Sequence, residues 1–133
     1  MVAALFAGSA VAVGSDPAQL AAARAKGADY LRLAQSPDGS WTSPNAPGIS
    51  GLCVYALLRS GAGVDDPGVA KGIAHLQAFV HDDGGIYAQD SKHKNYETSI
   101  ALLAFQAANS DGRHKTVVDN AVAFLRGIQW DAD

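Results

Sequence analysis

The chain has 133 residues, which is enough for one domain with a single core. It is 48% apolar and 17% charged, as a folded protein is, and its abundant alanine and few β-branched runs favour helix. The net charge of −3 and the lack of any lysine and arginine cluster argue against a nucleic-acid-binding surface. The one cysteine, Cys53, excludes an internal disulfide and a cysteine-rich zinc site.

The first residues, MVAALFAGSAVAVG, are small and apolar. They resemble the hydrophobic region and A-x-A end of a secretory signal, with Ala10 and Ala12 as the small pair, but they lack its basic start. Residues 1–14 are therefore interpreted as a signal-peptide remnant or an apolar arm. The expected location is secreted or periplasmic, with the cytoplasm as the alternative. No segment has the length and hydropathy that a transmembrane helix requires.

The first predicted helix, residues 17–35, starts at an Asp-Pro pair that caps it. It is amphipathic, because one side carries apolar residues at steps of three and four: Leu20, Ala23, Gly27, Tyr30, Leu31 and Ala34. The second predicted helix, residues 50–61, is apolar nearly all round. A helix without a polar face is expected to be buried on every side.

This pattern recurs along the rest of the chain. A second Asp-Pro pair opens an amphipathic helix at 67–80, residues 98–108 are again apolar all round, and residues 115–129 form a third amphipathic helix. The alternation of wetted and enclosed helices predicts two layers, one of them facing solvent.

The chain contains internal repeats. KGADYLRLAQSPDGSW at 26–41 aligns with residues 71–86 at a constant offset of 45, so that Gly39 falls on Gly84 and Trp41 on Ile86. At an offset of 94, Tyr30 falls on Phe124 and Gln35 on Gln129. A period of 45–49 with two helices per unit indicates an array of helical hairpins.

The segment QSPDGSW has a structural interpretation. A glutamine in the last turn of a helix can bond the backbone groups that helix ends leave unpaired. The Pro-Asp-Gly turn reverses the chain, with Gly39 supplying a positive φ. Trp41 is then expected to cover Gln35 and to fasten one hairpin to the next.

These residues resemble a known repeat. The order Lys26, Gly27, Tyr30, Leu31, Gln35, Gly39, Trp41 is similar to the QW motif of the prenyltransferase and squalene-cyclase repeat family. The second copy is degenerate, with Val80 for the glutamine and Ile86 for the tryptophan, and the third has Gln129 directly followed by Trp130.

The resemblance implies an all-α fold of helical hairpins that forms an arc of an α/α toroid, a two-layer α/α barrel. Residues 15–133 would supply about two and a half repeats, an incomplete toroid. The chain would then be either a fragment or an open arc. The exposed flanks of its inner helices would meet the rest of the toroid or a second chain.

The class II cyclases of this family protonate isoprenoids with a D-x-D-D motif, which this sequence lacks. Asp65 and Asp66 are interpreted as a helix cap and turn, and Asp82 and Asp83 as turn residues. The DAD at 131–133 could open such a motif, but its place in a repeat loop argues against an acid site.

The zinc site of the prenyltransferase β subunits is not expected either. Gly51 stands where their D-x-C motif has aspartate, and no histidine has ligand spacing with Cys53. No metal and no cofactor are predicted.

The resemblance points to one region as the rim of a cavity. HKNYETS at 93–99 leads into a predicted inner helix, and inner-helix ends surround the central cavity of the toroid. Tyr96 and Glu97 are the candidate polar groups facing it, while Tyr55 either lines an apolar pocket or packs in the core.

Three functions remain open. The first is a non-catalytic or cryptic family member that provides a scaffold or a cavity for an apolar, isoprenoid-like ligand. The second is a fragment of a terpene cyclase/mutase, a squalene–hopene-cyclase-like isomerase whose acid motif lies outside the chain. The third is a protein-interaction array. Catalytic residues are left unassigned.

Overall fold

The computed structural model describes residues 16–129, which form five α-helices. They are α1 (Pro17–Ala34), α2 (Pro47–Arg59), α3 (Pro67–Gln77), α4 (Lys94–Ala107) and α5 (Lys115–Gly127). The described range contains no strand beyond one isolated bridge between Val80 and Ile86. The predicted all-α class is therefore confirmed. Residues 1–14 and Trp130, Asp131 and Asp133, on which some predictions fall, lie outside the described residues.

The helix boundaries differ from the predicted ones by up to four residues. The predicted helix 67–80 ends at Gln77 because Val80 pairs with Ile86 in the bridge. The second helix begins at Pro47 rather than residue 50, with proline in its first turn, where a missing N–H costs nothing. The fourth helix begins at Lys94 and so includes Tyr96 and Glu97.

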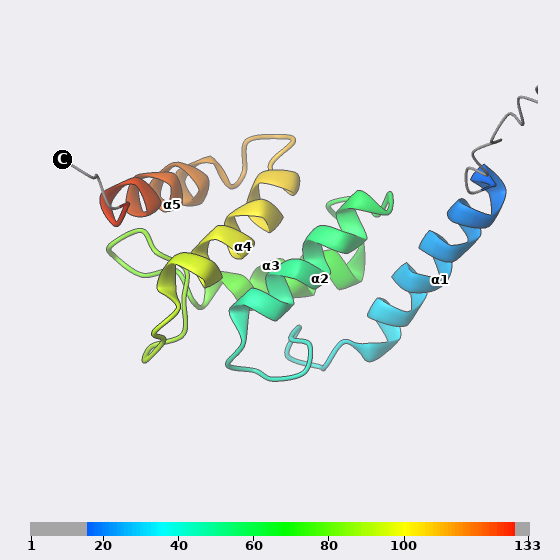
Figure 1. The fold of residues 1–133 in the computed structure, drawn as a ribbon, viewed down its shortest axis with the longest axis horizontal. Helices are drawn as coiled ribbons and strands as arrows, with labels where there is room; N and C mark the ends of the chain where they lie inside the picture. The colour runs from blue at the N-terminus through cyan, green and yellow to red at the C-terminus, as the bar shows by residue number, and fades with distance from the viewer. Residues whose placement is uncertain (1–15, 130–133) are drawn as a thin grey trace, which may run out of the picture.

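The five helices are arranged as repeating neighbours. Helices α2 and α4 pack side by side, α3 packs on α2 and also touches α4, and α5 packs on α4. Helix α1 makes only a small contact with α2. Figure 1 shows α1 and α5 at opposite ends of the long axis, with α3 behind α2. Each helix thus contacts its near neighbours in the series, as in other repeat proteins.

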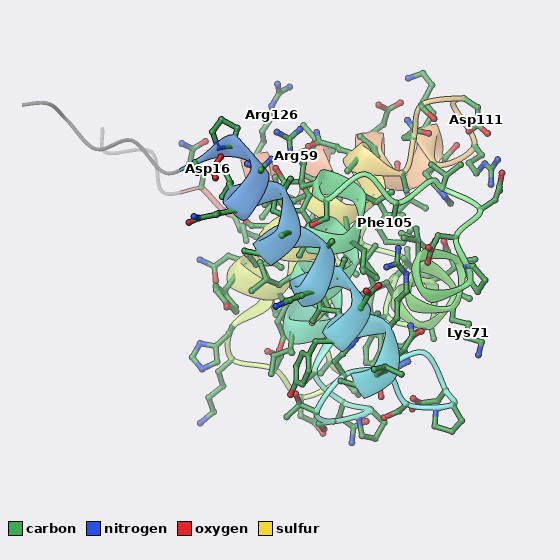
Figure 2. All side chains as sticks on the ribbon, turned by 90° about the vertical axis from the view of Figure 1, so that its right-hand side faces the viewer. Asp16, Arg59, Lys71, Phe105, Asp111 and Arg126 are labelled. Atoms are coloured by element: carbon green, nitrogen blue, oxygen red, sulfur yellow. The ribbon has the colours of Figure 1, made fainter. Side chains whose placement is uncertain are left out.

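The core lies between the α2–α4 pair and the helices that cover it. It is built from aliphatic and aromatic side chains with two loop residues at its edge: Trp41, Val54, Leu57, Val69, Ile73, Leu76, Ile86, Leu102 and Phe105. Phe105 is the largest side chain that is fully buried (Figure 2). Ser50 and Thr98 are also buried, and each accepts a hydrogen bond from a loop N–H.

Two burial predictions are wrong. Helices α2 and α4 are not enclosed on every side, because Leu52 is 51% exposed and Leu103 39% exposed. The apolar stripe predicted for α1 is also largely exposed, and Tyr30 in it is 70% exposed. In both cases the reason is that no described helix lies over these faces.

The helices of the structure test the prediction that no segment has the length and hydropathy of a transmembrane helix. Of the helices in residues 16–129, not one combines the length and the hydropathy needed to cross a bilayer.

Two glycines at equivalent helix positions predict opposite effects of alanine. A Cβ at Gly72 in α3 would lie 2.3 Å from Val54 Cγ2 and 3.1 Å from the Trp41 ring, whereas a Cβ at Gly27 in α1 would have no described atom within 4 Å apart from its chain neighbours and its own helix backbone. We expect Gly72→Ala to lower the free energy of unfolding by about 1–3 kcal/mol through overpacking. We expect Gly27→Ala to raise it by up to about 1 kcal/mol, because alanine favours helix. Urea titration measures both, and equal effects would contradict the packing.

Candidate functional site

The loop between α1 and α2 fastens the first hairpin to the second. Gln35 Nε2 donates to Gly39 O at 3.1 Å and to Gly68 O in α3 at 2.9 Å. Trp41 Nε1 donates to Leu31 O at 2.8 Å, and the ring is 3% exposed. Both side chains therefore bond backbone carbonyls rather than each other, and the glutamine reaches directly to α3.

A close backbone contact completes this junction. Gly39 has φ +87°, and a Cβ there would lie 2.3 Å from Lys71 O in α3. Gly72, one residue further along α3, lies against the Trp41 ring. Only glycine permits both approaches, since any Cβ would push the loop or the ring away.

The same junction occurs again between α3 and α4. Gly84 has φ +86°, and a Cβ there would lie 2.6 Å from Asn120 O in α5. Asp83 Oδ1 accepts from Gly85 N, as Asp38 Oδ1 accepts from Ser40 N in the first loop. Ile86 N donates to Thr98 Oγ1, as Trp41 N donates to Ser50 Oγ. The structure thus repeats at the offset of 45 in the loops, at 48 between Ser50 of α2 and Thr98 of α4, and at 49 between Lys71 of α3 and Asn120 of α5.

An ion pair adds a second link between α1 and the start of α3. The Arg32 guanidinium, in the last turn of α1, donates from Nε and Nη2 to Asp66 Oδ2 at 3.1 and 3.0 Å. Asp66 Oδ1 meanwhile accepts from Gly68 N and Val69 N, so the same carboxylate caps α3. Burial raises the pKa of Asp66, but the hydrogen bonds from Arg32 and the two amides outweigh it, and the pKa is lowered overall.

An open hollow on the described surface lies at the start of α4. It is an open groove of about 680 Å³, and its lining includes Phe79, His81, Tyr87, His93 and Glu97. Glu97 Oε2 accepts from Ala88 N at 2.9 Å, which holds the loop against α4. The lining is mixed in character, and aromatic surface alternates with polar groups.

A polar cluster backs this groove. Tyr87 Oη donates to Asp83 Oδ2 at 2.6 Å, and the His81 ring stacks on Tyr87 at 4.0 Å between centroids. Lys94 Nζ lies 4.3 Å from the centre of the Tyr87 ring, over its face. The hydrogen bond to Asp83 stabilises the neutral phenol and raises the pKa of Tyr87 to about 12. The same bond lowers the pKa of Asp83.

The three candidate cavity residues lie in different surroundings in the structure. Glu97 lines the groove, whereas Tyr96 is 59% exposed and its ring lies over Gly48 of α2. Tyr55 is half-buried and packs against the core. That these three residues face a ligand stays a prediction.

The aspartates considered as acids have structural partners. Asp66 caps α3, Asp83 closes a turn, and Asp65 pairs with Arg113 at 3.3 Å. The pKa values of Asp66 and Asp83 are lowered, so both are ionised at neutral pH and neither is poised to protonate a hydrocarbon. Cys53 is half-buried in α2, and residues 16–129 contain no group of three or more side chains that could hold a metal.

Sequence reasoning missed two of these features. The Arg32–Asp66 pair joins residues far apart in sequence, and only the packing of α1 near α3 brings them together. The Asp83–Tyr87–His81 cluster has no counterpart in the first loop, where Thr42 takes the place of Tyr87. Comparing the two repeats of the sequence therefore gave no signal for this cluster.

The chain was also compared with known proteins. It is 27% identical over 138 aligned positions to a probable squalene–hopene cyclase of Sinorhizobium fredii, an alignment that covers 85% of this chain. The chain resembles a squalene–hopene cyclase. It spans about a fifth of the length of that curated relative, 21%. No family model matches the chain. No solved structure matches it either.

The junction made by the first loop predicts a large loss of stability on removal of its tryptophan. We expect Trp41→Ala to lower the free energy of unfolding by about 3 kcal/mol, because it empties a site at the contact of two hairpins. Leu33→Ala is the control, since Leu33 is 88% exposed, and we expect a change within about 0.5 kcal/mol. Denaturant titration giving similar values for the two variants would mean that the indole does not join the hairpins.

The Tyr87–Asp83 bond predicts a shifted phenol titration. Because the folded pKa, about 12, lies above the ordinary value of 10, the bond contributes stability below pH 10 that is lost as the pH rises through 12. The ultraviolet titration of tyrosinate should show one group, absent in Tyr87→Phe, that ionises last. Asp83→Asn should move that group toward 10, and an unchanged titration would refute the bond.

Proposed function

We propose that the chain is a section of a squalene-cyclase-type repeat scaffold, an arc of an α/α toroid whose inner helices form part of a wall for an apolar, isoprenoid-like ligand. The observation that carries the proposal is the exposure of Leu52 on α2 and Leu103 on α4. These two helices pack side by side, and both leucines lie on faces that the outer helices do not cover.

The repeated junction supports the toroid as the architecture. Each loop presses a glycine onto the backbone of the next outer helix, through Gly39 on Lys71 and Gly84 on Asn120. Because the same contact recurs in the same order, successive hairpins are added with one sense of rotation. Such a series curves into an arc.

The state of the carboxylates supports a scaffold rather than an enzyme. Cyclisation that starts by protonating a hydrocarbon requires a carboxylic acid kept neutral, with a raised pKa. Within residues 16–129, the aspartates with shifted pKa values, including Asp38, Asp66 and Asp83, all have their pKa lowered by hydrogen bonds.

The alternative is a section of a terpene cyclase/mutase whose acid motif lies outside these residues. The similarity to a probable squalene–hopene cyclase favours it. In that case the α2 and α4 leucines would line the same kind of wall, in an intramolecular transferase.

Hydrocarbon binding tests the proposal. The purified chain is loaded with squalene from detergent, washed and extracted, and the bound hydrocarbon is quantified by mass spectrometry. We expect the double variant Leu52→Glu, Leu103→Glu to retain about tenfold less than the unaltered chain, because two apolar contacts are lost.

The control is Leu33→Glu, the same change at a more exposed leucine of α1. It should retain as much squalene as the unaltered chain. Equal retention by the double variant, or no retention by any form, would refute an apolar wall on α2 and α4.

A further inference from the structure

The loop that precedes α4 departs from the repeat by an insertion. Trp41 N and Ile86 N donate equivalent hydrogen bonds at an offset of 45, whereas the residues that accept them, Ser50 and Thr98, are 48 apart. Three extra residues therefore lie between Ile86 and Thr98. The consecutive residues 87–93 of this stretch all line the groove at the start of α4, and Figure 1 shows them in yellow-green. The insertion thus contributes directly to the groove.

The side chains of the groove are also specific to this loop. Three lining residues differ in kind from their equivalents at the offsets of 45 and 48: Phe79 replaces Ala34, His81 replaces Ser36, and Glu97 replaces Ile49. The first repeat forms its hairpin junction without an aromatic ring or a carboxylate at these positions, so the fold does not require them. What the three residues share is the groove.

Glu97 supplies the groove with a carboxylate that has no cationic partner. Its side chain is half-buried, and Oε2 accepts a hydrogen bond from Ala88 N at 2.9 Å. None of the ion pairs within residues 16–129 involves Glu97, and no described group donates to its other oxygen, Oε1. A carboxylate that is partly removed from water is stabilised by a cation that donates to it. This side of the groove therefore favours a positively charged ligand.

The other charges near the groove do not neutralise Glu97. Asp90 and Lys92 also line it, but both are exposed and their charges have opposite signs, so they offset each other. Lys94 Nζ lies over the Tyr87 ring, 4.3 Å from its centre. His81 Nε2 donates to the Tyr87 carbonyl at 2.9 Å, so Nδ1 of the neutral ring is an acceptor. The groove thus offers a negative charge and a further hydrogen-bond acceptor.

Aromatic surface lies along the same groove. Phe79 and His81 are both half-buried, and the His81 ring stacks on Tyr87 with 4.0 Å between the ring centres. An organic cation with an aromatic body can pack against such rings while its ammonium group meets the carboxylate. The groove has a volume of about 680 Å³, within the range of roughly 300–1,000 Å³ that is typical of small-molecule sites.

We propose that this groove binds a small organic ammonium ion with an aromatic body. The ammonium group donates to Glu97 Oε1, and the aromatic body lies against Phe79 and His81. The inference does not rest on the hydrocarbon wall, because Leu52 and Leu103 do not line the groove.

2-Phenylethylammonium is the probe, because it carries one ammonium group on a phenyl ring. Its binding to the full chain is measured by isothermal titration calorimetry at neutral pH and low salt. We expect saturable binding. 2-Phenylethanol has the same body without the charge and should bind at least about tenfold more weakly, because it forms no charge-assisted hydrogen bond with the carboxylate.

A matched pair of variants locates the site. In Glu97→Gln the amide oxygen can still accept from Ala88 N, but the charge is gone, and we expect at least about tenfold weaker binding of 2-phenylethylammonium. Asp82→Asn makes the same change of charge at an exposed residue of the same loop that does not line the groove. It should change the affinity by less than about twofold. Thermal melts of both variants show whether the fold is intact.

Four results would overturn the proposal. The first is the absence of saturable binding of 2-phenylethylammonium, and the second is equal affinity for 2-phenylethanol. The third is an equal loss of affinity in Glu97→Gln and Asp82→Asn. The fourth is equally tight binding of Nα-acetyl-lysinamide, which has the ammonium group without an aromatic body. That result would make a lysine side chain of a polypeptide the occupant of the groove.

Discussion

The structure depends on one steric constraint, the contact of a loop with the backbone of the helix that opens the next hairpin. Gly39 lies on Lys71 O, and beside it the Trp41 ring lies on Gly72. Neither contact leaves space for a Cβ, so the distance between hairpins is set by bare backbone. Hydrogen bonds from Gln35 and from the indole N–H then hold the loop in that position.

The second junction shows which residue changes the backbone contact permits. Gly84 repeats the backbone contact on α5, but Ile86 replaces the tryptophan, and Ala121 stands where α3 has Gly72. Ile86 and Ala121 are both fully buried. The second junction therefore has a smaller loop side chain and a larger helix residue than the first. The motif letters have changed while the glycine contact and the buried loop residue are kept, which is why the degenerate copy still folds as a repeat.

Packing by repetition also determines which surfaces stay open. Helices α2 and α4 lie in the middle of the series and have neighbours on several sides, yet each keeps a face that no described helix covers. The large apolar residues exposed on these two helices include Ile49 and Leu52 of α2 and Leu103 of α4.

The sequence by itself determined the local features. Asp-Pro pairs, helical periodicity and the repeat offset identify the helices, their order and the turn at Gly39, because these depend on contacts between near neighbours in the chain. Only the tertiary structure decided which apolar faces are buried and which polar groups meet. The stripe on α1 reads as a core stripe in sequence yet lies exposed, because burial requires a partner that sequence periodicity does not specify. Arg32 meets Asp66, and Asp83 meets Tyr87, for the same reason: their distances follow from the packing of whole helices and loops.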